Sequence, residues 1–193
     1  MNKITLEGAD ETVLRVWVEK IHYLEGQMLS VDVELAHEAE NERLRDTVQK
    51  LGAFRGVALL TALTLATELG DIRRFASPRQ LMAYLGMVPS EHSSGARTHR
   101  GPITKSGNTR ARKALVSAAW KYAAKPARSA SLIKRQEGVD PHVIATAWKA
   151  QQRLYKRFHA LAFRKPRSVA NVAVARELAG FLWAALQPVD ARV

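Results

Sequence analysis

A run of apolar residues at alternating three- and four-residue spacings is the feature that most constrains the fold of this chain. It consists of Leu14, Trp17, Ile21, Leu24, Met28, Val31 and Leu35. This spacing places every member on one narrow stripe of a helix, which is the pattern of a coiled-coil seam over three heptads. The polar residues beside the seam favour a coiled-coil arm that pairs two chains. An amphipathic helix that lies on the chain's own core is the alternative.

The heptad pattern fails after the seam and then resumes in a new register. It fails at Glu38 and Glu42 and resumes at Leu44, Val48 and Leu51. We still expect one long helix here. The sequence therefore predicts three parts, which are an acidic coiled-coil helical arm (1–50), a compact helical domain (51–187) and a short tail (188–193).

Residues 51–71 predict two helices joined by a tight turn. One helix is expected to end near Phe54, Gly56 to form the turn, and a second helix to run to Leu69. The layout matches a helix-hairpin-helix, in which backbone N–H groups at the turn bind a phosphate. Ala58 occupies the position of the second glycine of that motif, so a hairpin used only for packing is an equal alternative.

Helical patterns dominate the rest of the chain. Ser77 and Pro78 fit the cap and the first position of a helix, and further helices are expected at residues 109–124, 142–163 and 169–186. The last helix should bury Val172, Ala175, Leu178, Ala179, Leu182 and Trp183. Strand-like sequence is scarce. The predicted fold class is therefore mainly α, with a basic loop or a small β-ribbon near residues 96–104.

Positive charge is concentrated after residue 50. The chain has a net charge of +12, yet residues 1–50 hold six basic and eleven acidic residues. Residues 92–136 hold eleven Lys and Arg and no Asp or Glu. A field of this sign favours a polyanionic partner, either DNA or RNA. The stretch from Lys149 to Arg167 is a second candidate surface.

An anionic membrane is the competing partner for a basic chain. No run approaches the roughly 18 continuous apolar residues of a membrane-spanning helix, and the N-terminus lacks a basic start followed by an apolar run. The chain has no Cys, which excludes disulfides and thiolate metal sites. We therefore expect a cytoplasmic protein with no membrane partner.

The loop over residues 85–115 combines hydroxyl groups with cations. Ser93, Ser94 and Gly95 lie beside Arg97, Arg100, Lys105, Arg110, Arg112 and Lys113. A serine oxygen can attack phosphorus, and guanidinium groups can offset the charge of the transition state. A phosphate-binding loop in which the serines only form turns is the alternative, and residue chemistry alone favours it. The acids and His show no metal-ligand spacing, and no nucleotide-binding motif occurs.

Several phrases of the sequence resemble the C-terminal domain of the DEDD-type insertion-sequence transposases, the bridge-RNA-guided serine recombinases. They are RGVALLTA (55–62), ELGDIRRFASPRQLMAYLGMVPSEHSSG (68–95), RGPITKSGNTRARKALVSAA (100–119) and VAVARELAGFLWA (172–184). The resemblance spans roughly residues 44–187. It implies DNA transposition by attack of a serine on a DNA phosphate.

The resemblance also implies roles for individual residues. The serine that precedes Gly in the family motif corresponds to Ser94, which makes it the candidate nucleophile, with Ser93 as second choice. Contacts with the backbone of DNA or a guide RNA are implied for Arg97, Arg100, Lys105, Asn108, Arg110, Arg112 and Lys113. The family's Mg²⁺ is held by four acids of an N-terminal RuvC-like domain. We therefore expect no metal and no other cofactor on this chain itself.

The chain starts at the coiled coil, without that RuvC-like domain. We therefore expect a truncated transposase that is inactive alone and needs metal-site acids from elsewhere. Residues 14–35 would join it to a second copy or to a full-length transposase. The alternative is a non-catalytic DNA- or RNA-binding module, or a regulator of a full-length transposase.

Overall fold

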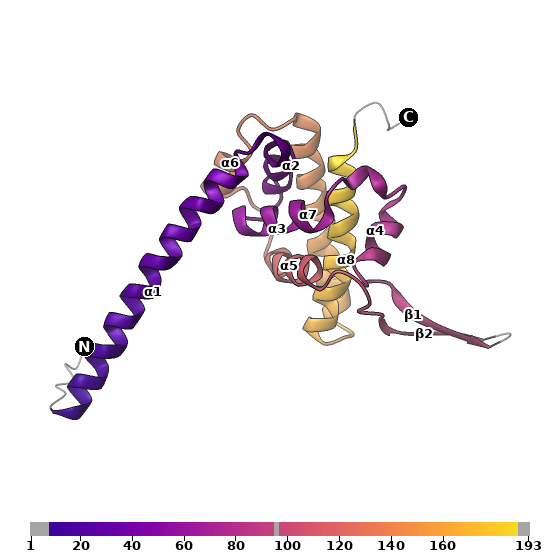
Figure 1. Ribbon diagram of the computed structural model, residues 1–193. Helices are drawn as coiled ribbons and strands as arrows, with labels where there is room; N and C mark the ends of the chain where they lie inside the picture. The colour runs from indigo at the N-terminus through magenta and orange to yellow at the C-terminus, as the bar shows by residue number, and fades with distance from the viewer. Residues whose placement is uncertain (1–7, 95–96, 189–193) are drawn as a thin grey trace.

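The computed structural model of the chain describes residues 8–94 and 97–188, apart from the side chains of residues 92–100. Within these ranges the elements follow the order α1 to α4, β1, β2 and α5 to α8. Figure 1 shows a body of short and medium helices from which two elements project, the long helix α1 and the β1–β2 ribbon. The expected mainly α fold class is confirmed.

Helix α1 (Ala9–Ala39) leaves the body as an isolated arm (Figure 1). Its contacts with the body are with α2 and α3, and among its residues only Leu35 and Ala39 are not classed as exposed. The predicted seam is open to solvent, with Trp17 57% and Met28 66% exposed. The alternative in which this helix covers the chain's own core is therefore wrong.

The single helix expected over residues 1–50 is interrupted where the heptad pattern fails. A second helix, α2 (Glu42–Gly52), begins after Asn41, whose side-chain oxygen accepts a hydrogen bond from the Arg43 N–H at 3.1 Å. Asn is a favoured cap because it satisfies an N–H group that has no partner within the helix. Helix α2 buries Val48 and Leu51 in the body. The acidic first part of the chain is thus an exposed arm followed by a core helix.

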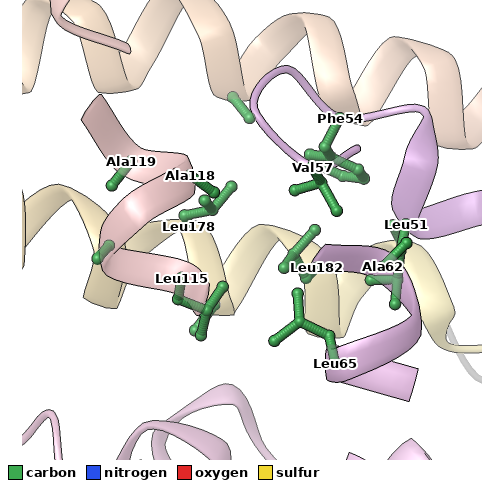
Figure 2. Packing of buried hydrophobic residues seen from close by; sticks show 14 of the residues in the cluster. Leu51, Phe54, Val57, Ala62, Leu65, Leu115, Ala118, Ala119, Leu178 and Leu182 are labelled. Atoms are coloured by element: carbon green, nitrogen blue, oxygen red, sulfur yellow. The ribbon is translucent and has the colours of Figure 1, made fainter. Parts of the chain in front are cut away.

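The body is made of seven α-helices and two short 3-10 turns. Besides α2 they are α3 (Leu59–Leu69), α4 (Pro78–Tyr84), α5 (Thr109–Ala119), α6 (Ala130–Arg135), α7 (Pro141–Ala162) and α8 (Arg167–Leu186), with η1 (Ile72–Arg74) and η2 (Trp120–Ala123). Helix α8 contacts α7, α5, α4 and α2. Figure 2 shows Leu178 and Leu182 of α8 together with Leu115 of α5 and Leu65 of α3 in the core.

The composition of α8 suits its place at the centre of the body. Small buried residues such as Ala175 and Ala179 allow neighbouring helices to approach closely. The buried Asn171 donates through Nδ2 to the Val116 carbonyl oxygen at 2.8 Å, which ties α8 to α5. Of the helices in the described residues, α8 is the one with the length and apolar content that a membrane span would need. Packing against its four neighbours explains that content.

Two residues of α8 are less buried than expected. Val172 and Trp183 are only half-buried. Val172 lines a hollow on the surface of the body. The Trp183 indole N–H donates to the Phe75 carbonyl oxygen at 2.8 Å. The indole therefore contributes a hydrogen bond between α8 and the segment before α4.

The turn between α2 and α3 packs against the chain itself. Gly56 has φ 82°, and a Cβ there would collide with the Ala118 carbonyl group at the end of α5. The Arg135 guanidinium donates to the Val57 carbonyl oxygen. Later segments therefore cover this turn, which favours the packing hairpin over the phosphate-binding one.

Helix boundaries follow the expected capping residues. The Ser77 side chain accepts from the Gln80 N–H at 3.4 Å, and Pro78 is the first residue of α4. Helices α7 and α8 begin and end within two residues of their expected positions. Helix α5 ends earlier than expected and continues as η2. Helix α6 was not expected, because six residues are too few to show a helical period.

The ribbon consists of two antiparallel strands, β1 (Pro89–Ser94) and β2 (Arg97–Ile103). In its register Ser94 lies opposite Arg97, Ser93 opposite Thr98 and His92 opposite His99, with an irregularity between Pro89 and Glu91. The ribbon expected near residues 96–104 is confirmed, and its first strand begins at Pro89.

Candidate nucleic-acid interface

The root of the ribbon is fixed by two glycines that let backbone segments cross closely. Gly86 follows α4 with φ 63°, and Gly107 precedes α5 with φ 119°. A Cβ at Gly86 would collide with the Ser106 carbonyl oxygen, and one at Gly107 with that of Tyr84. The Lys105 N–H also donates to the Gly86 carbonyl oxygen at 3.0 Å. The end of α4 is thereby held against the segment between β2 and α5, where several of the predicted cations lie.

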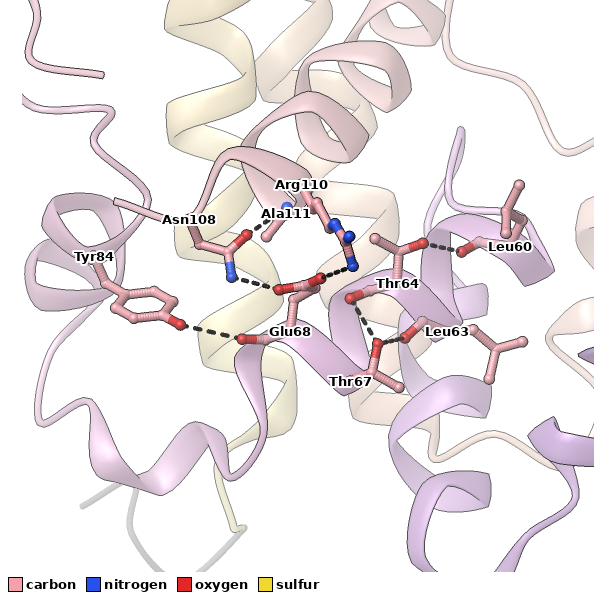
Figure 3. A network of polar contacts seen from close by, with 9 residues as sticks. All are labelled: Leu60, Leu63, Thr64, Thr67, Glu68, Tyr84, Asn108, Arg110 and Ala111. Carbon is pink, nitrogen blue, oxygen red and sulfur yellow. Dashed lines mark hydrogen bonds and ion pairs between the residues drawn. The ribbon is translucent and has the colours of Figure 1, made fainter. Parts of the chain in front are cut away.

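Both groups of the Asn108 side-chain amide are used within the protein (Figure 3). Its Oδ1 accepts from the Ala111 N–H at 2.9 Å and caps α5, and its Nδ2 donates to Glu68 Oε2 at 2.7 Å. We expected Asn108 to contact a nucleic-acid backbone. The structure gives it a structural role at the start of the helix that carries the cations.

Glu68 is the acid of this network, and the sequence analysis did not single it out. Its side chain is 24% exposed and also receives a contact from Arg110 Nη1 at 3.5 Å. The Tyr84 hydroxyl donates to the Glu68 backbone carbonyl at 3.2 Å. Acids are scarce after residue 50, and this scarcity was the one sign in the sequence of a specific role for Glu68. Nothing in the sequence linked Glu68 to Asn108, forty residues later.

Arg74 and Tyr84 close the network on the side of α4. The Arg74 guanidinium lies 4.5 Å from the ring centroids of both Phe75 and Tyr84. Hydrogen bonding from Asn108, and then from Arg74, lowers the pKa of the Tyr84 hydroxyl. The cation–π contacts stabilise this position of the guanidinium, so Arg74 supports the root of the ribbon.

Arg110 and Arg112 have different surroundings. The half-buried Arg112 donates to the Leu85 carbonyl oxygen at 2.8 Å and to the Thr109 hydroxyl at 3.1 Å, which ties α5 to the end of α4. The Arg110 side chain is 84% exposed and touches the protein through the edge of the Glu68 carboxylate. Arg110 can therefore turn toward a phosphate, whereas Arg112 is committed to the fold.

Lys105 and Lys113, like Arg110, are predicted cations that are open to solvent. Both are exposed, and neither makes an ion pair with another described residue. The remaining predicted residues lie in the ribbon. Ser93 and Ser94 belong to β1 and Arg97 and Arg100 to β2, but their side chains lie outside the described residues, as does Gly95.

The described residues can hold phosphates more readily than metal ions. No three His, Asp or Glu side chains gather in the described part of the chain as metal ligands would. A hollow of about 760 Å³ at the root of the ribbon is lined by apolar residues and by Lys and Arg. The cations are Arg79, Lys105, Arg157, Lys165 and Arg176, and Glu177 also lines the hollow.

The described residues form a mainly α body with exposed cations beside a ribbon, and the proteins that resemble the chain carry the word transposase in their names. Residues 48–134 match the Transposase IS116/IS110/IS902 family, so this part of the chain is similar to insertion-sequence transposases. The resemblance found in the sequence is confirmed at this level. The C-terminal position, the guide RNA and the truncation stay predictions.

Individual relatives agree with the family. The chain is 48% identical over 155 residues to a protein of Sinorhizobium fredii with the name "Putative transposase y4qE", and the match covers 80% of this chain and 40% of that protein. It is 38% identical over 77 residues to the transposase for insertion sequence element IS1111A of Coxiella burnetii, covering 40% and 21%. For the transposase of IS1328 of Yersinia enterocolitica the identity is 33% over 104 residues, covering 53% and 31%. The chain thus spans less than half the length of these relatives.

Replacing Asn108 by Ala should destabilise the protein by roughly 1–2 kcal/mol, because α5 loses its cap and Glu68 loses a donor. Asn108→Ser keeps an oxygen that can cap the helix and should cost less. Urea unfolding followed by circular dichroism measures the change. Lys113→Ala, on the exposed side of the same helix, is the control and should stay within about 0.5 kcal/mol. An Asn108→Ala protein as stable as the wild type would mean that the amide is available for other contacts.

Proposed function

We propose that this chain is a DNA-binding part of an insertion-sequence transposase that holds DNA at the ribbon and supplies a nucleophile, Ser94. The 48% identity to a named transposase over 155 residues carries the proposal. The run of eleven cations without an acid over residues 92–136 supports DNA as the partner. A guide RNA, which the resemblance implies, presents the same phosphate groups.

The proposed clamp consists of the exposed Lys105, Arg110 and Lys113 together with Arg97 and Arg100 of β2. Each cation that neutralises a phosphate releases a condensed counterion, which favours binding and makes it depend on salt. Ser94 lies opposite Arg97 in the register of the ribbon. The proposed nucleophile and one clamp residue therefore occupy paired positions of the two strands. A phosphate bound by Arg97 would then lie near Ser94.

In the proposed reaction the Ser94 hydroxyl loses its proton and its oxygen attacks a DNA phosphorus. A P–O bond to serine forms while the bond from phosphorus to one sugar oxygen breaks, and that oxygen takes up a proton and leaves as a hydroxyl. Nearby arginines offset the negative charge that builds on the phosphoryl oxygens. The described residues do not form a metal site. The Mg²⁺ that the resemblance implies would have to be held by acids outside the described residues.

The serine assignment predicts a covalent adduct. Wild-type chain incubated with nicked or junction DNA and a full-length relative should give a protein–DNA band that resists denaturing electrophoresis. Ser94→Ala should abolish the band because it removes the attacking oxygen, whereas the neighbouring Ser93→Ala should keep it. A band that persists in Ser94→Ala would sink the assignment. DNA binding without any adduct would favour the alternative, a non-catalytic binding module or regulator.

The clamp assignment predicts a change in salt dependence. Lys105→Glu combined with Lys113→Glu should weaken binding of a 20-bp duplex by about 10-fold or more at 0.1 M salt, and should lower the salt slope by roughly 2. Fluorescence anisotropy across a salt series measures both quantities. The control is Arg43→Glu combined with Arg45→Glu, which makes the same charge change at exposed residues of α2. Equal effects of the two double variants would contradict the clamp.

We also infer that α1 pairs with a second copy or with a full-length transposase. Its apolar seam is exposed from Leu14 to Val31, and soluble chains rarely leave such a continuous apolar stripe unpartnered. Pairing two seams would bury it by knobs-into-holes packing. The acidic residues of the arm are unsuited to contact phosphate, so this role is separate from the clamp.

The pairing predicts that Ile21→Glu, which places a charge in the seam, shifts the protein toward a smaller species in analytical ultracentrifugation. Val33→Glu is the control, because Val33 is 61% exposed on the same helix but lies outside the seam. If wild-type chain sediments as a monomer at concentrations where both variants do, the helix does not pair two copies of this chain.

A further inference from the structure

The outer face of α7 carries a row of cations that the clamp does not use. Residues 141–176 contain eight Lys and Arg and no Asp or Glu. Spacings of three and four residues place Lys149, Arg153, Lys156 and then Phe163 along one stripe of the helix, with Arg157 and Arg164 beside it. We name these six residues the α7 stripe. From Lys149 to Arg164 it is about 22 Å long, given the rise of 1.5 Å per residue in an α-helix.

A hollow of about 1030 Å³ runs beside the α7 stripe. Four of the stripe's cations line it, and Glu177 and Phe181 of α8 form part of the opposite side. The Glu177 carboxylate bonds to Arg153 and lies 3.9 Å from Arg157. One acid thus holds two guanidinium groups at the hollow without cancelling their charge. Lys149 and Lys156 are exposed and make no ion pair with another described residue.

Phe163 gives the stripe a second chemical character. It follows the last turn of α7 and is 89% exposed, with Arg164 and Lys165 directly after it. An exposed ring among cations is the combination that proteins use to bind unpaired nucleic-acid strands, since bases stack on the ring while cations contact the phosphates. A duplex would satisfy the cations but would leave the ring without a stacking partner.

The stripe is continuous with the root of the ribbon. Arg157 and Glu177 line both the hollow at the ribbon and the hollow beside the stripe, so the two adjoin. A strand that passes the ribbon root at Lys105 can therefore continue over Lys165 onto α7 without leaving a cationic surface. We propose that the α7 stripe is a second nucleic-acid site, which takes an unpaired strand and stacks one of its bases on Phe163.

An anionic membrane fits the α7 stripe less well. A helix that lies in a membrane surface needs a broad apolar face beside its cations. The apolar face of α7, with Val143, Ala147, Leu154 and Phe158, is buried in the body. Among the large hydrophobic residues of α7 and its C-cap, Phe163 is the one with a mostly exposed side chain. A cationic surface with a single exposed aromatic ring therefore favours an unpaired nucleic-acid strand over a lipid surface.

The inference rests on the proposed nucleic-acid binding but on different residues, so the two can fail separately. Binding of labelled 20-mers of dT and of rU is measured by anisotropy, with a 20-bp duplex for comparison. Lys149→Glu combined with Lys156→Glu should weaken binding of at least one single strand by about 10-fold or more at 0.1 M salt. The double variant of Arg43 and Arg45 is again the control for net charge. The 20-mer that loses more affinity identifies whether DNA or RNA is the source of the strand.

Phe163→Ala should weaken single-strand binding by about 5-fold or more and leave the duplex unchanged, because only unpaired bases stack. Phe163→Trp keeps a ring and should restore the affinity. The substituted side chains are exposed, and thermal unfolding checks that each variant is folded.

Three results would overturn the inference. The first is an α7 double variant that binds strands as tightly as its control, even if the Lys105 and Lys113 variant is impaired. The second is an equal loss of strand and duplex in Phe163→Ala. The third is binding to phosphatidylglycerol vesicles that the α7 double variant loses while strand binding persists. If the Lys105 and Lys113 variant binds as tightly as its control and the α7 double variant binds more weakly, the clamp is refuted and the α7 stripe is supported.

Discussion

Helix α8 is enclosed by α7, α5, α4 and α2, and its burial is the interaction on which the other positions depend. Leu178 and Leu182 are almost fully buried, and burying each such side chain contributes about 1.5–3 kcal/mol. Small residues between them let the neighbours approach, and Asn171 and Trp183 add hydrogen bonds that select one arrangement. Helices α4 and α5 both pack on α8, and the ribbon is the segment that joins them.

The polar residues of the basic segment divide into two groups that composition alone does not separate. Arg112 donates to backbone and hydroxyl groups within the fold, and Asn108 is used as a cap and as a partner of Glu68. Lys105, Arg110 and Lys113 are turned outward beside them. The first group holds the second in place, since without the cap and the tie to α4 the start of α5 would have no fixed position at the root of the ribbon.

The two projecting elements differ in charge and in chemistry. The arm α1 is acidic and carries an apolar seam, which suits association with another helix. The ribbon, the start of α5 and the outer face of α7 are basic, which suits phosphate groups. A nucleic acid on the basic surfaces is repelled by the acidic arm, so protein association and nucleic-acid binding can use separate parts of one chain without competition.

Periodicity and capping residues in the sequence determined the mainly α class, the seam from Leu14 to Leu35, the helices α7 and α8 within two residues, and the ribbon as a small departure from helix. These features are local, and spacing or a single cap decides them. Tertiary contacts decided the rest. The Gly56 turn packs on Ala118, Glu68 meets Asn108 across forty residues, and the seam from Leu14 to Val31 remains exposed because the core closes without it. Such contacts depend on which helix surfaces meet when α8 is buried. The residue spacing within one segment of the sequence does not determine which surfaces these are.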